Sequence, residues 1–241
     1  MKIYVKSAGF SVNQDYSWMN QNGKNIEMDL TVLSYNVDGI KFVWRSTADK
    51  IYIFGNAFTD KSRTDLYNRP LRNYVLLEGQ TDESEFMFTC FEKMILNQEN
   101  FESMLNGSVR NEGGDSESGF SVDFQKISAY FDICLFAGRE AHKVKRHLYE
   151  KDSYEARQEL LKELWGMQKS PVMLLVGGEL SDGRLHALAP DRALLSRVSD
   201  AERRKYQDRN SGKAHLLLKT TAALGAVILA SSVLALAAKK D

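Results

Sequence analysis

The stretch IKFVWRSTADKIYIFGNAF (residues 40–58) is rich in aromatic and β-branched side chains and contains the short segment ADK (48–50) near its middle. Side chains of these types pack well on a pleated, half-buried surface. We therefore expect two strands, over residues 40–46 and 50–58, that are joined by a short turn. This hairpin indicates that the first half of the chain is rich in β-structure.

Neighbouring segments continue the pattern on both sides. Aromatic and β-branched residues, partly alternating with polar ones, predict further strands over residues 2–10, 27–35 and 72–79. The dipeptide Asp38–Gly39 favours a hairpin turn just before residue 40. Residues 81–105 then place their apolar side chains at helical spacing, so a helix is expected to follow the strands.

The second half of the chain has a different pattern. A polar, glycine-rich segment at 106–119 predicts a flexible loop. Beyond it, two apolar runs that end in glycine, residues 127–138 and 170–178, flank a segment of helical character, 139–169. Strand, helix and strand in this order indicate a parallel βαβ unit. Residues 189–210 are expected to form a last helix before the end of the chain.

Together these segments predict one α+β domain over residues 1–208, with a β-rich N-terminal half and a βαβ-like C-terminal half. The chain has 241 residues, which is enough to bury one well-formed core. A basic juxtamembrane linker at 209–219 and one C-terminal transmembrane helix at 220–238 are expected to follow the domain.

The transmembrane prediction depends on the segment TTAALGAVILASSVLALAA (residues 220–238), which carries no charge and no proline. A helix needs roughly 20 such residues to cross a bilayer. The alternative is a buried C-terminal helix of a soluble domain, but such helices normally carry a polar stripe. The apolar and small residues that would form the membrane anchor are Leu224, Gly225, Val227, Ile228, Leu229, Val233, Leu234 and Leu236.

The flanks of this segment predict its orientation. Only three residues follow it, so we expect a tail anchor that inserts after synthesis, and six lysine and arginine residues lie between 203 and 219. Positive charge beside a span favours the cytoplasmic side. The domain is therefore expected to face the cytoplasm from the cell inner membrane, with the lipid bilayer as a partner. Ala222, Ala226 and Ala230 follow a spacing that allows self-association of such helices.

Charge and composition narrow the classes of function. The chain has 32 Lys and Arg residues against 32 Asp and Glu residues, so its net charge gives no basis for nucleic-acid binding. Cys90 and Cys134 lie in apolar runs and are expected to be buried thiols. His142 and His147 are five residues apart and do not share a helix face, so no metal site is expected. No phosphate-binding, dinucleotide-binding or nucleophile-elbow motif occurs, and we assign no cofactor and no catalytic residue.

One polar segment is a candidate for ligand binding. The stretch DKSRTDLYNRPLRN (60–73) gathers several arginines, whose planar guanidinium groups suit phosphate and carboxylate. The alternative is a solvated loop in which aspartates and arginines pair locally. The candidate anion- or ligand-binding residues are Arg63, Asp65, Arg69, Arg72 and Asn73.

Two stretches, IYVKSAGFSVNQDYSWM (3–19) and SRTDLYNRPLRN (62–73), resemble segments of uncharacterised accessory proteins of bacterial anti-phage conflict systems. The resemblance implies a small accessory, sensor or membrane-linked component that acts beside other proteins of the same pathway. It implies no role for any single residue.

These observations favour a tail-anchored, cytoplasm-facing membrane protein that acts as a non-enzymatic interaction, scaffold or sensor component. The first alternative is a membrane-tethered enzyme that binds a nucleotide or a phosphate ester through residues 63–73. The second is an oligomeric membrane effector, in which the transmembrane helices pack together through their small residues.

Overall fold

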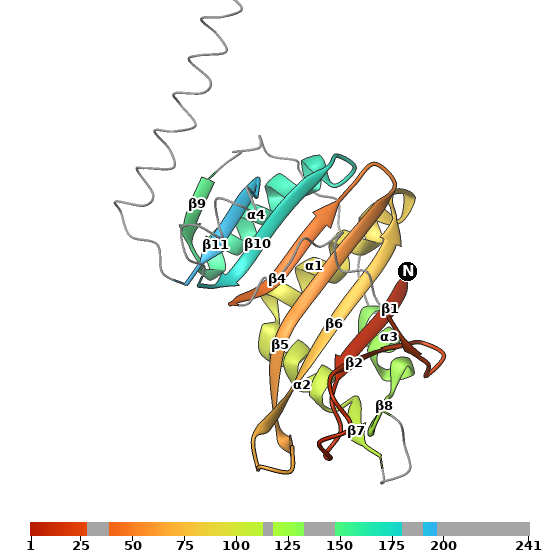
Figure 1. The fold of residues 1–241 in the computed structure, drawn as a ribbon. Coiled ribbons are helices and arrows are strands. Elements are labelled where there is room, and N and C mark those ends of the chain that lie inside the picture. Colours follow the sequence, from red (N-terminus) through yellow and green to blue (C-terminus); the bar gives the residue numbers. More distant parts are fainter. Residues whose placement is uncertain (28–38, 113–117, 133–147, 180–189, 197–241) are drawn as a thin grey trace, which may run out of the picture. The chain divides into compact units, whose positions relative to one another are not determined.

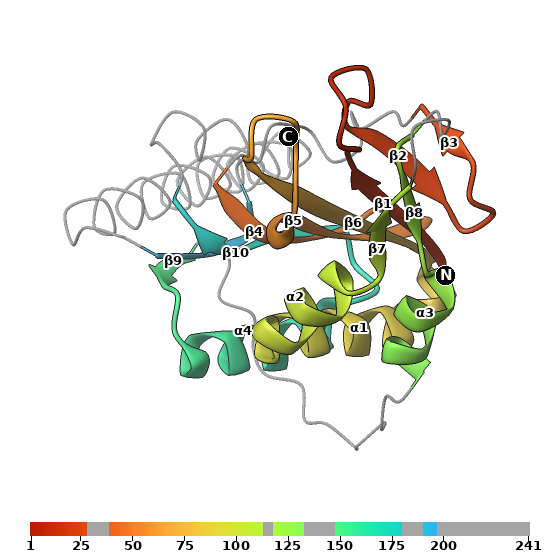
Figure 2. The same ribbon diagram turned by 90° about the horizontal axis from the view of Figure 1, so that it is seen from below.

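The computed structural model describes residues 1–27, 39–112, 118–132, 148–179 and 190–196 (Figure 1). All of them fall within one compact unit of the chain. Their strands form a nine-stranded mixed sheet in the order β3-β2-β1-β6-β5-β4-β10-β11-β9, and a separate two-stranded hairpin, β7-β8. The helices of the described residues lie against one face of the large sheet (Figure 2). The predicted α+β class is therefore confirmed for this part of the chain.

The N-terminal strands are all antiparallel to their neighbours. The hairpin predicted over residues 40–58 is present, and the backbone N–H of Thr47 donates to the carbonyl of Lys50 at 2.8 Å across its turn. The two strands after this turn run on past the rest of the sheet and form a projecting hairpin (Figure 1). The strands are β1 (Lys2–Ser7), β2 (Ser17–Asn20), β3 (Asn25–Ile26), β4 (Ile40–Ser46), β5 (Lys50–Thr64) and β6 (Pro70–Gln80).

Side chains alternate between the two faces of these strands, as the period of a strand requires. On the helix side, Ile3 and Val5 of β1 and Trp44 of β4 belong to the main core. The ring of Trp44 lies 5.5 Å from that of Phe91 in the first helix, which ties the sheet to the helical layer. The aromatic residues that predicted the strands are thus the ones that hold the helices against them.

The helical prediction over 81–105 is confirmed, with a break at Asn97 that separates two helices. Part of the segment predicted as a flexible loop, 106–119, is instead a strand of the small hairpin, because Val109 and its neighbours pair with residues 120–122. Phe120 is buried there. The elements are a 3₁₀ turn (Thr81–Glu83), α1 (Ser84–Leu96), α2 (Gln98–Asn106), β7 (Val109–Asn111), β8 (Phe120–Val122) and α3 (Phe124–Asp132).

The C-terminal part contains a parallel βαβ unit, in which the second strand lies where it was predicted and the first does not. Strand β9 (Leu148–Lys151) leads into α4 (Tyr154–Met167), which crosses to β10 (Val172–Gly178). Strand β11 (Arg192–Leu195) lies between β9 and β10 and is parallel to both. Strand β10 also pairs with β4, in antiparallel fashion. The sheet therefore changes from antiparallel to parallel at the β4–β10 contact.

Three predictions in this part were wrong or incomplete. Residues 127–132 belong to α3 and not to a strand, because Ile127 and Phe131 are four apart and both face the core. Residues 192–195 form β11 and not a helix, because all four are buried inside the sheet. Residues 139–147 of the segment expected to be helical lie outside the described residues, residues 148–151 form β9, and α4 begins at Tyr154, where the hydroxyl of Ser153 accepts a hydrogen bond from Ala156 N–H.

The predicted linker at 209–219 and the predicted transmembrane helix at 220–238 lie outside the described residues. Among the helices that the structure does describe, none has the length and the hydropathy needed to cross a bilayer.

A buried ion pair joins the elements of the parallel unit. The side chains of Arg192 on β11 and Glu163 on α4 are both fully buried, with Nη1 and Oε2 at 2.6 Å. Arg192 Nη2 also lies 3.3 Å from Oε2 of Glu150 on β9. Both ions have lost their hydration, so each stabilises the core only while the other is present. The pair therefore fixes how α4 lies across β11.

We expect Glu163→Gln to lower the free energy of unfolding by about 3–5 kcal/mol, because it leaves the Arg192 charge buried without its main partner. Urea titration followed by circular dichroism measures this change. The double variant Glu163→Leu/Arg192→Met removes both charges and should recover most of the loss. A double variant as unstable as Glu163→Gln would contradict this account.

Candidate binding groove

A groove of about 540 Å³ lies at the end of the sheet where the β5–β6 hairpin projects. One wall is the loop between β1 and β2, and the other is the hairpin turn after β5 (Figure 1). We call it the tip groove. Its lining residues are Ala8, Gly9, Phe10, Ser11, Val12, Gln14, Asp15, Tyr16, Asp65, Leu66, Tyr67, Arg69, Pro70, Leu71, Arg72 and Tyr74.

The tip groove carries most of the large hydrophobic side chains that are exposed among the described residues. Five large hydrophobic side chains are exposed in that part of the chain, and four of them line this groove: Phe10 (47%), Val12 (65%), Leu66 (52%) and Tyr67 (67%). Clustered exposed apolar side chains mark interaction surfaces, whereas scattered ones need no explanation. The clustering, and not the exposure of any one residue, makes this groove the candidate site.

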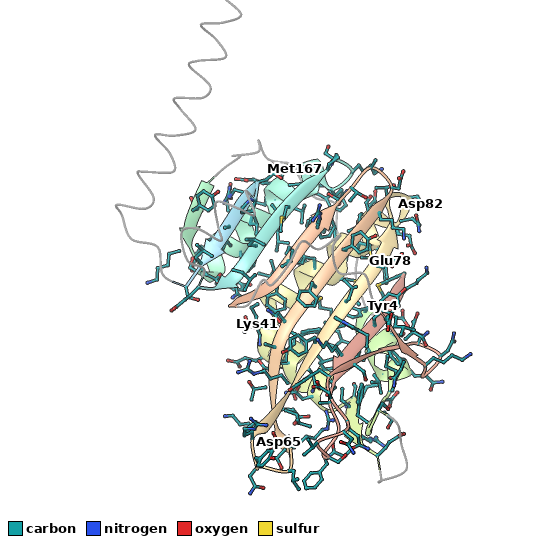
Figure 3. All side chains as sticks on the ribbon, viewed as in Figure 1. Tyr4, Lys41, Asp65, Glu78, Asp82 and Met167 are labelled. Carbon is teal, nitrogen blue, oxygen red and sulfur yellow. The ribbon has the colours of Figure 1, made fainter. Side chains whose placement is uncertain are left out.

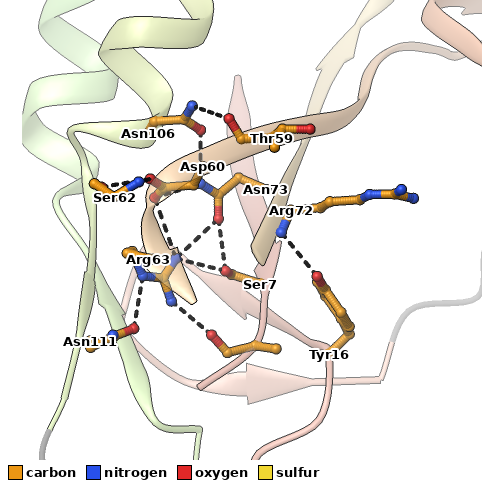
Figure 4. Close-up of polar contacts among 11 residues, drawn as sticks. Ser7, Tyr16, Thr59, Asp60, Ser62, Arg63, Arg72, Asn73, Asn106 and Asn111 are labelled. Atoms are coloured by element: carbon orange, nitrogen blue, oxygen red, sulfur yellow. Dashed lines mark hydrogen bonds and ion pairs between the residues drawn. The ribbon is translucent and has the colours of Figure 1, made fainter. Parts of the chain in front are cut away.

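Beneath the groove, a buried arginine connects its two walls (Figure 4). Arg63, the second-last residue of β5, is only 5% exposed. Its Nη2 donates to the carbonyl of Ala8 at 2.7 Å, and its Nη1 donates to the hydroxyl of Ser7 at 3.0 Å. Its Nε donates to Oδ1 of Asn111 on β7 at 2.8 Å. Burial lowers the pKa of Arg63, and the charge of Asp60 opposes this.

Asn73 on β6 completes the same network. Its Oδ1 accepts from Ser7 Oγ at 2.7 Å and from Arg63 Nη1 at 3.2 Å. Its Nδ2 donates to Oδ1 of Asn106 at the end of α2, at 2.9 Å. Strands β1, β5, β6 and β7 and helix α2 therefore converge on one group of polar side chains, which holds the base of the groove in a fixed geometry.

The loop wall is held by a buried glutamine. Gln14 is 8% exposed, and its Oε1 accepts from Ser11 N–H at 3.2 Å. A methyl group at Gly9 would lie 2.5 Å from Oε1 of Gln14, and one at Gly119 would lie 2.3 Å from it. Gly119 also has a φ of +68°. The two glycines leave the space that the Gln14 side chain occupies.

The hairpin wall is held by Asp65. Its Oδ1 accepts from the N–H groups of Tyr67 and Arg69, both at 2.9 Å, and its Oδ2 accepts from Arg69 Nε at 2.7 Å. Desolvation opposes ionisation of this carboxylate, but the hydrogen bonds from Arg69 and Tyr67 and the Arg69 charge bring the pKa of Asp65 below its ordinary value. The turn therefore keeps its Asp65 contacts at mildly acidic pH, and Asn68 adopts a left-handed conformation at its tip.

A third contact joins the walls on the solvent side. The hydroxyl oxygen of Tyr16 accepts from the backbone N–H of Arg72 at 2.9 Å. The Tyr16 ring meets that of Tyr74 edge to face at 5.8 Å, and the Lys6 ammonium lies within 6 Å of both ring centroids. The Arg72 guanidinium has no carboxylate of the described residues within ion-pairing distance, so it leaves a positive charge at the groove.

The structure divides the five predicted site residues into two groups. Asp65, Arg69 and Arg72 line the tip groove, and Asp65 lies at the projecting turn (Figure 3). Arg63 and Asn73 are buried below it, with their polar atoms engaged by other parts of the chain. They do not form one clamp with the other three. The local Asp–Arg pairing of the alternative interpretation is present between Asp65 and Arg69.

Sequence reasoning missed the apolar part of the groove. Phe10 and Val12 stand in an otherwise polar loop, and Leu66 and Tyr67 stand in an otherwise polar turn. Apolar side chains in short polar loops cannot pack into the core, so their presence there was a signal of a binding surface that could have been read from the sequence. Of the other predictions, Cys90 is buried in α1, whereas Cys134, His142 and His147 lie outside the described residues.

Comparison with known protein families, curated proteins and solved structures found no match to this chain. Its function is therefore inferred from the geometry of its own residues.

We expect Arg63→Met to lower the free energy of unfolding by roughly 2–4 kcal/mol, because it leaves the buried acceptors of Ser7, Ala8 and Asn111 without their donor. The matched control is Arg69→Met, since the Arg69 side chain is 73% exposed and pairs only locally. Chemical denaturation compares the two. Equal midpoints for both variants would show that the Arg63 network does not hold the groove.

Proposed function

We propose that this chain is a membrane-anchored, non-enzymatic interaction protein, and that its tip groove binds a segment of a partner protein. The observation that carries the proposal is the gathering of Phe10, Val12, Leu66 and Tyr67 on two facing walls. Aromatic residues and arginine are the types that dominate binding energy at protein interfaces. Two of the four side chains, Phe10 and Tyr67, are aromatic, and leaving all four in water costs free energy unless a partner covers them.

The chemistry of the groove describes the partner segment. Its apolar walls favour an aromatic or aliphatic side chain, and the guanidinium of Arg72, which forms no ion pair within the described residues, favours a carboxylate beside it. Arg69 is already paired with Asp65 and adds no net charge. Asp15 also lines the groove, so the four charged lining residues sum to zero, and the segment is expected to be short and apolar with a carboxylate placed at Arg72.

The rigidity of the groove favours specific binding over non-specific hydrophobic association. Arg63, Gln14 and Asp65 hold the two walls before any partner arrives, so little conformational entropy is lost on binding. An enzyme that clamps a phosphate ester through residues 63–73 would have to rely on Arg69 and Arg72, because Arg63 and Asn73 are engaged below the surface. We therefore favour the interaction protein.

The membrane anchor and the pathway complete the proposal. Tethering confines the domain to a surface and raises its effective concentration toward partners there. The stretches 3–19 and 62–73, which resemble accessory proteins of anti-phage conflict systems, supply the two walls of the groove. We infer a component of a bacterial anti-phage defence pathway that recruits or senses another of its proteins at the inner membrane.

We expect a stoichiometric partner to co-purify with the full-length chain from native membranes in mild detergent, and to be lost with the double variant Phe10→Ser/Tyr67→Ser. Binding should weaken roughly tenfold or more, because these two residues are the exposed aromatic side chains of the groove. Affinity purification with quantitative mass spectrometry measures this.

Tyr154→Ser is the matched control, because Tyr154 is 55% exposed and lies outside the groove. A partner that is retained by Tyr154→Ser and lost by the groove variant supports the proposal. A partner retained by both variants, or no partner at all, would overturn it.

Removal of residues 220–241 should release the remaining chain from the membrane fraction into the soluble fraction, because the expected anchor is the apolar part of this segment. Fractionation at high salt followed by immunoblotting measures the distribution. The control is Lys239→Ala, which leaves the apolar residues intact and should remain in the membrane fraction. A truncated chain that stays with the membrane would contradict the tail anchor.

A further inference from the structure

A second cavity, of about 360 Å³, lies at the ends of the strands where the sheet changes from antiparallel to parallel. Each of the three parallel strands contributes its carboxyl end: Asp152 follows β9, Gly177 and Gly178 end β10, and Ser196 follows β11. Strand β4 begins at the same place, and its first two residues, Ile40 and Lys41, line the cavity. In open sheets, ligands bind in the crevice outside the carboxyl ends of parallel strands.

The backbone around this cavity is held in conformations that few residues adopt. Gly39, Gly177 and Gly178 have φ values of +95°, +68° and +130°. Ala57 has a φ of +52° although it carries a side chain, and it lies in an irregular part of β5. A non-glycine residue in this region costs on the order of 1 kcal/mol or more and is found mainly at functional sites. All four of these residues line the cavity.

Glycine at position 177 keeps the cavity open. A methyl group there would lie 3.2 Å from Lys41 Cβ, 3.3 Å from Asp152 Oδ2 and 3.6 Å from Arg157 Nη2. The backbone thus approaches three charged side chains at the place where any other residue would fill the space.

The charge of the cavity comes from Lys41. Arg157 makes a bidentate pair with Asp152, at 2.7 and 2.6 Å, and also donates to the carbonyl of Ile95, so its charge is compensated. Among the described residues, the polar contacts of Lys41 are long: its Nζ lies 3.4 Å from the carbonyl of Ala57 and 3.9 Å from Oε2 of Glu102. Charge-assisted hydrogen bonds of an ammonium group are normally about 2.7–2.9 Å.

The surroundings of Lys41 favour an additional negative charge. Its ammonium lies 3.8 Å from the centroid of the ring of Phe58, a buried core residue that does not line the cavity. Burial lowers the pKa of Lys41 below its ordinary value, Glu102 opposes this, and the nearby charge of Arg72 adds to it. A bound anion would restore the electrostatic balance that Glu102, at 3.9 Å, supplies only in part.

We infer that this cavity is a binding site for a small oxyanion, of the phosphate or carboxylate type, and that Lys41 supplies the charge that holds it. The site is separate from the tip groove in its lining residues and does not depend on the function proposed for that groove. The volume suits a single phosphate or a small phosphorylated or carboxylated molecule and lies at the lower end of small-molecule sites.

The experiment compares thermal unfolding of the full-length chain, in mild detergent, in inorganic phosphate, sodium acetate and sodium chloride at equal ionic strength. We expect saturating phosphate or acetate to raise the midpoint by on the order of 3–6 °C over chloride. A rise with phosphate alone identifies a phosphoryl ligand, and a rise with acetate alone identifies a carboxylate. Equal midpoints in all three salts would overturn the proposal.

Three variants test the role of Lys41. Lys41→Met should abolish the oxyanion-dependent rise, and Glu102→Gln should increase the apparent affinity several-fold, because it removes the carboxylate that competes for Lys41. Glu102 is partly exposed, so this second variant is expected to fold even if the first does not. Lys50→Met is the matched control, because Lys50 does not line the cavity. Its ammonium pairs with the Glu78 carboxylate at 2.7 Å. A rise that persists in Lys41→Met, or an affinity unchanged in Glu102→Gln, would show that Lys41 does not hold the anion.

Discussion

The Arg63 guanidinium is the contact on which the tip groove depends. It joins the end of β1 to the base of the β5–β6 hairpin through Ser7 and Ala8, and it reaches the small hairpin through Asn111. A buried guanidinium is tolerated only where its donors find acceptors, and here the acceptors come from three separate segments of the chain. The buried Arg63 contacts therefore hold the spacing between the two walls, whatever side chains the walls expose.

The two candidate sites use the sheet in different ways. The tip groove forms where an antiparallel hairpin outruns its neighbours, and its chemistry is that of exposed apolar side chains. The Lys41 cavity forms where parallel strands end, and its chemistry is that of one incompletely paired charge. Between them lies an ordinary core, in which Trp44 and Phe91 hold the helices on the sheet. A protein that binds a partner at one place and a small anion at another could report one to the other, which suits a sensor.

Local patterns predicted the hairpin at 40–58, the helical region at 81–105 and strand β10, because each has a continuous run of apolar side chains with its own period. Strands β9 and β11 were missed because each has only four residues, which is too short to show a hydrophobic period. They form strands only by pairing with segments far away in the sequence. The site was half predicted for the same reason. The arginines at 63–72 were visible, but the burial of Arg63 depends on Ser7, Ala8 and Asn111, which no local pattern connects to it.

The order of the strands has a consequence for synthesis of the chain. Strand β4 lies inside the finished sheet, yet its contact with β10 joins residues such as Ser46 and Val172, which are 126 positions apart. At typical rates of translation, β4 is an open sheet edge for on the order of 10 s. Lys41 and Arg45 place positive charges along that edge, and charged side chains discourage the addition of foreign strands. The residue that we assign to anion binding in the folded protein is thus also one of two positive charges on a strand whose second partner is synthesised much later.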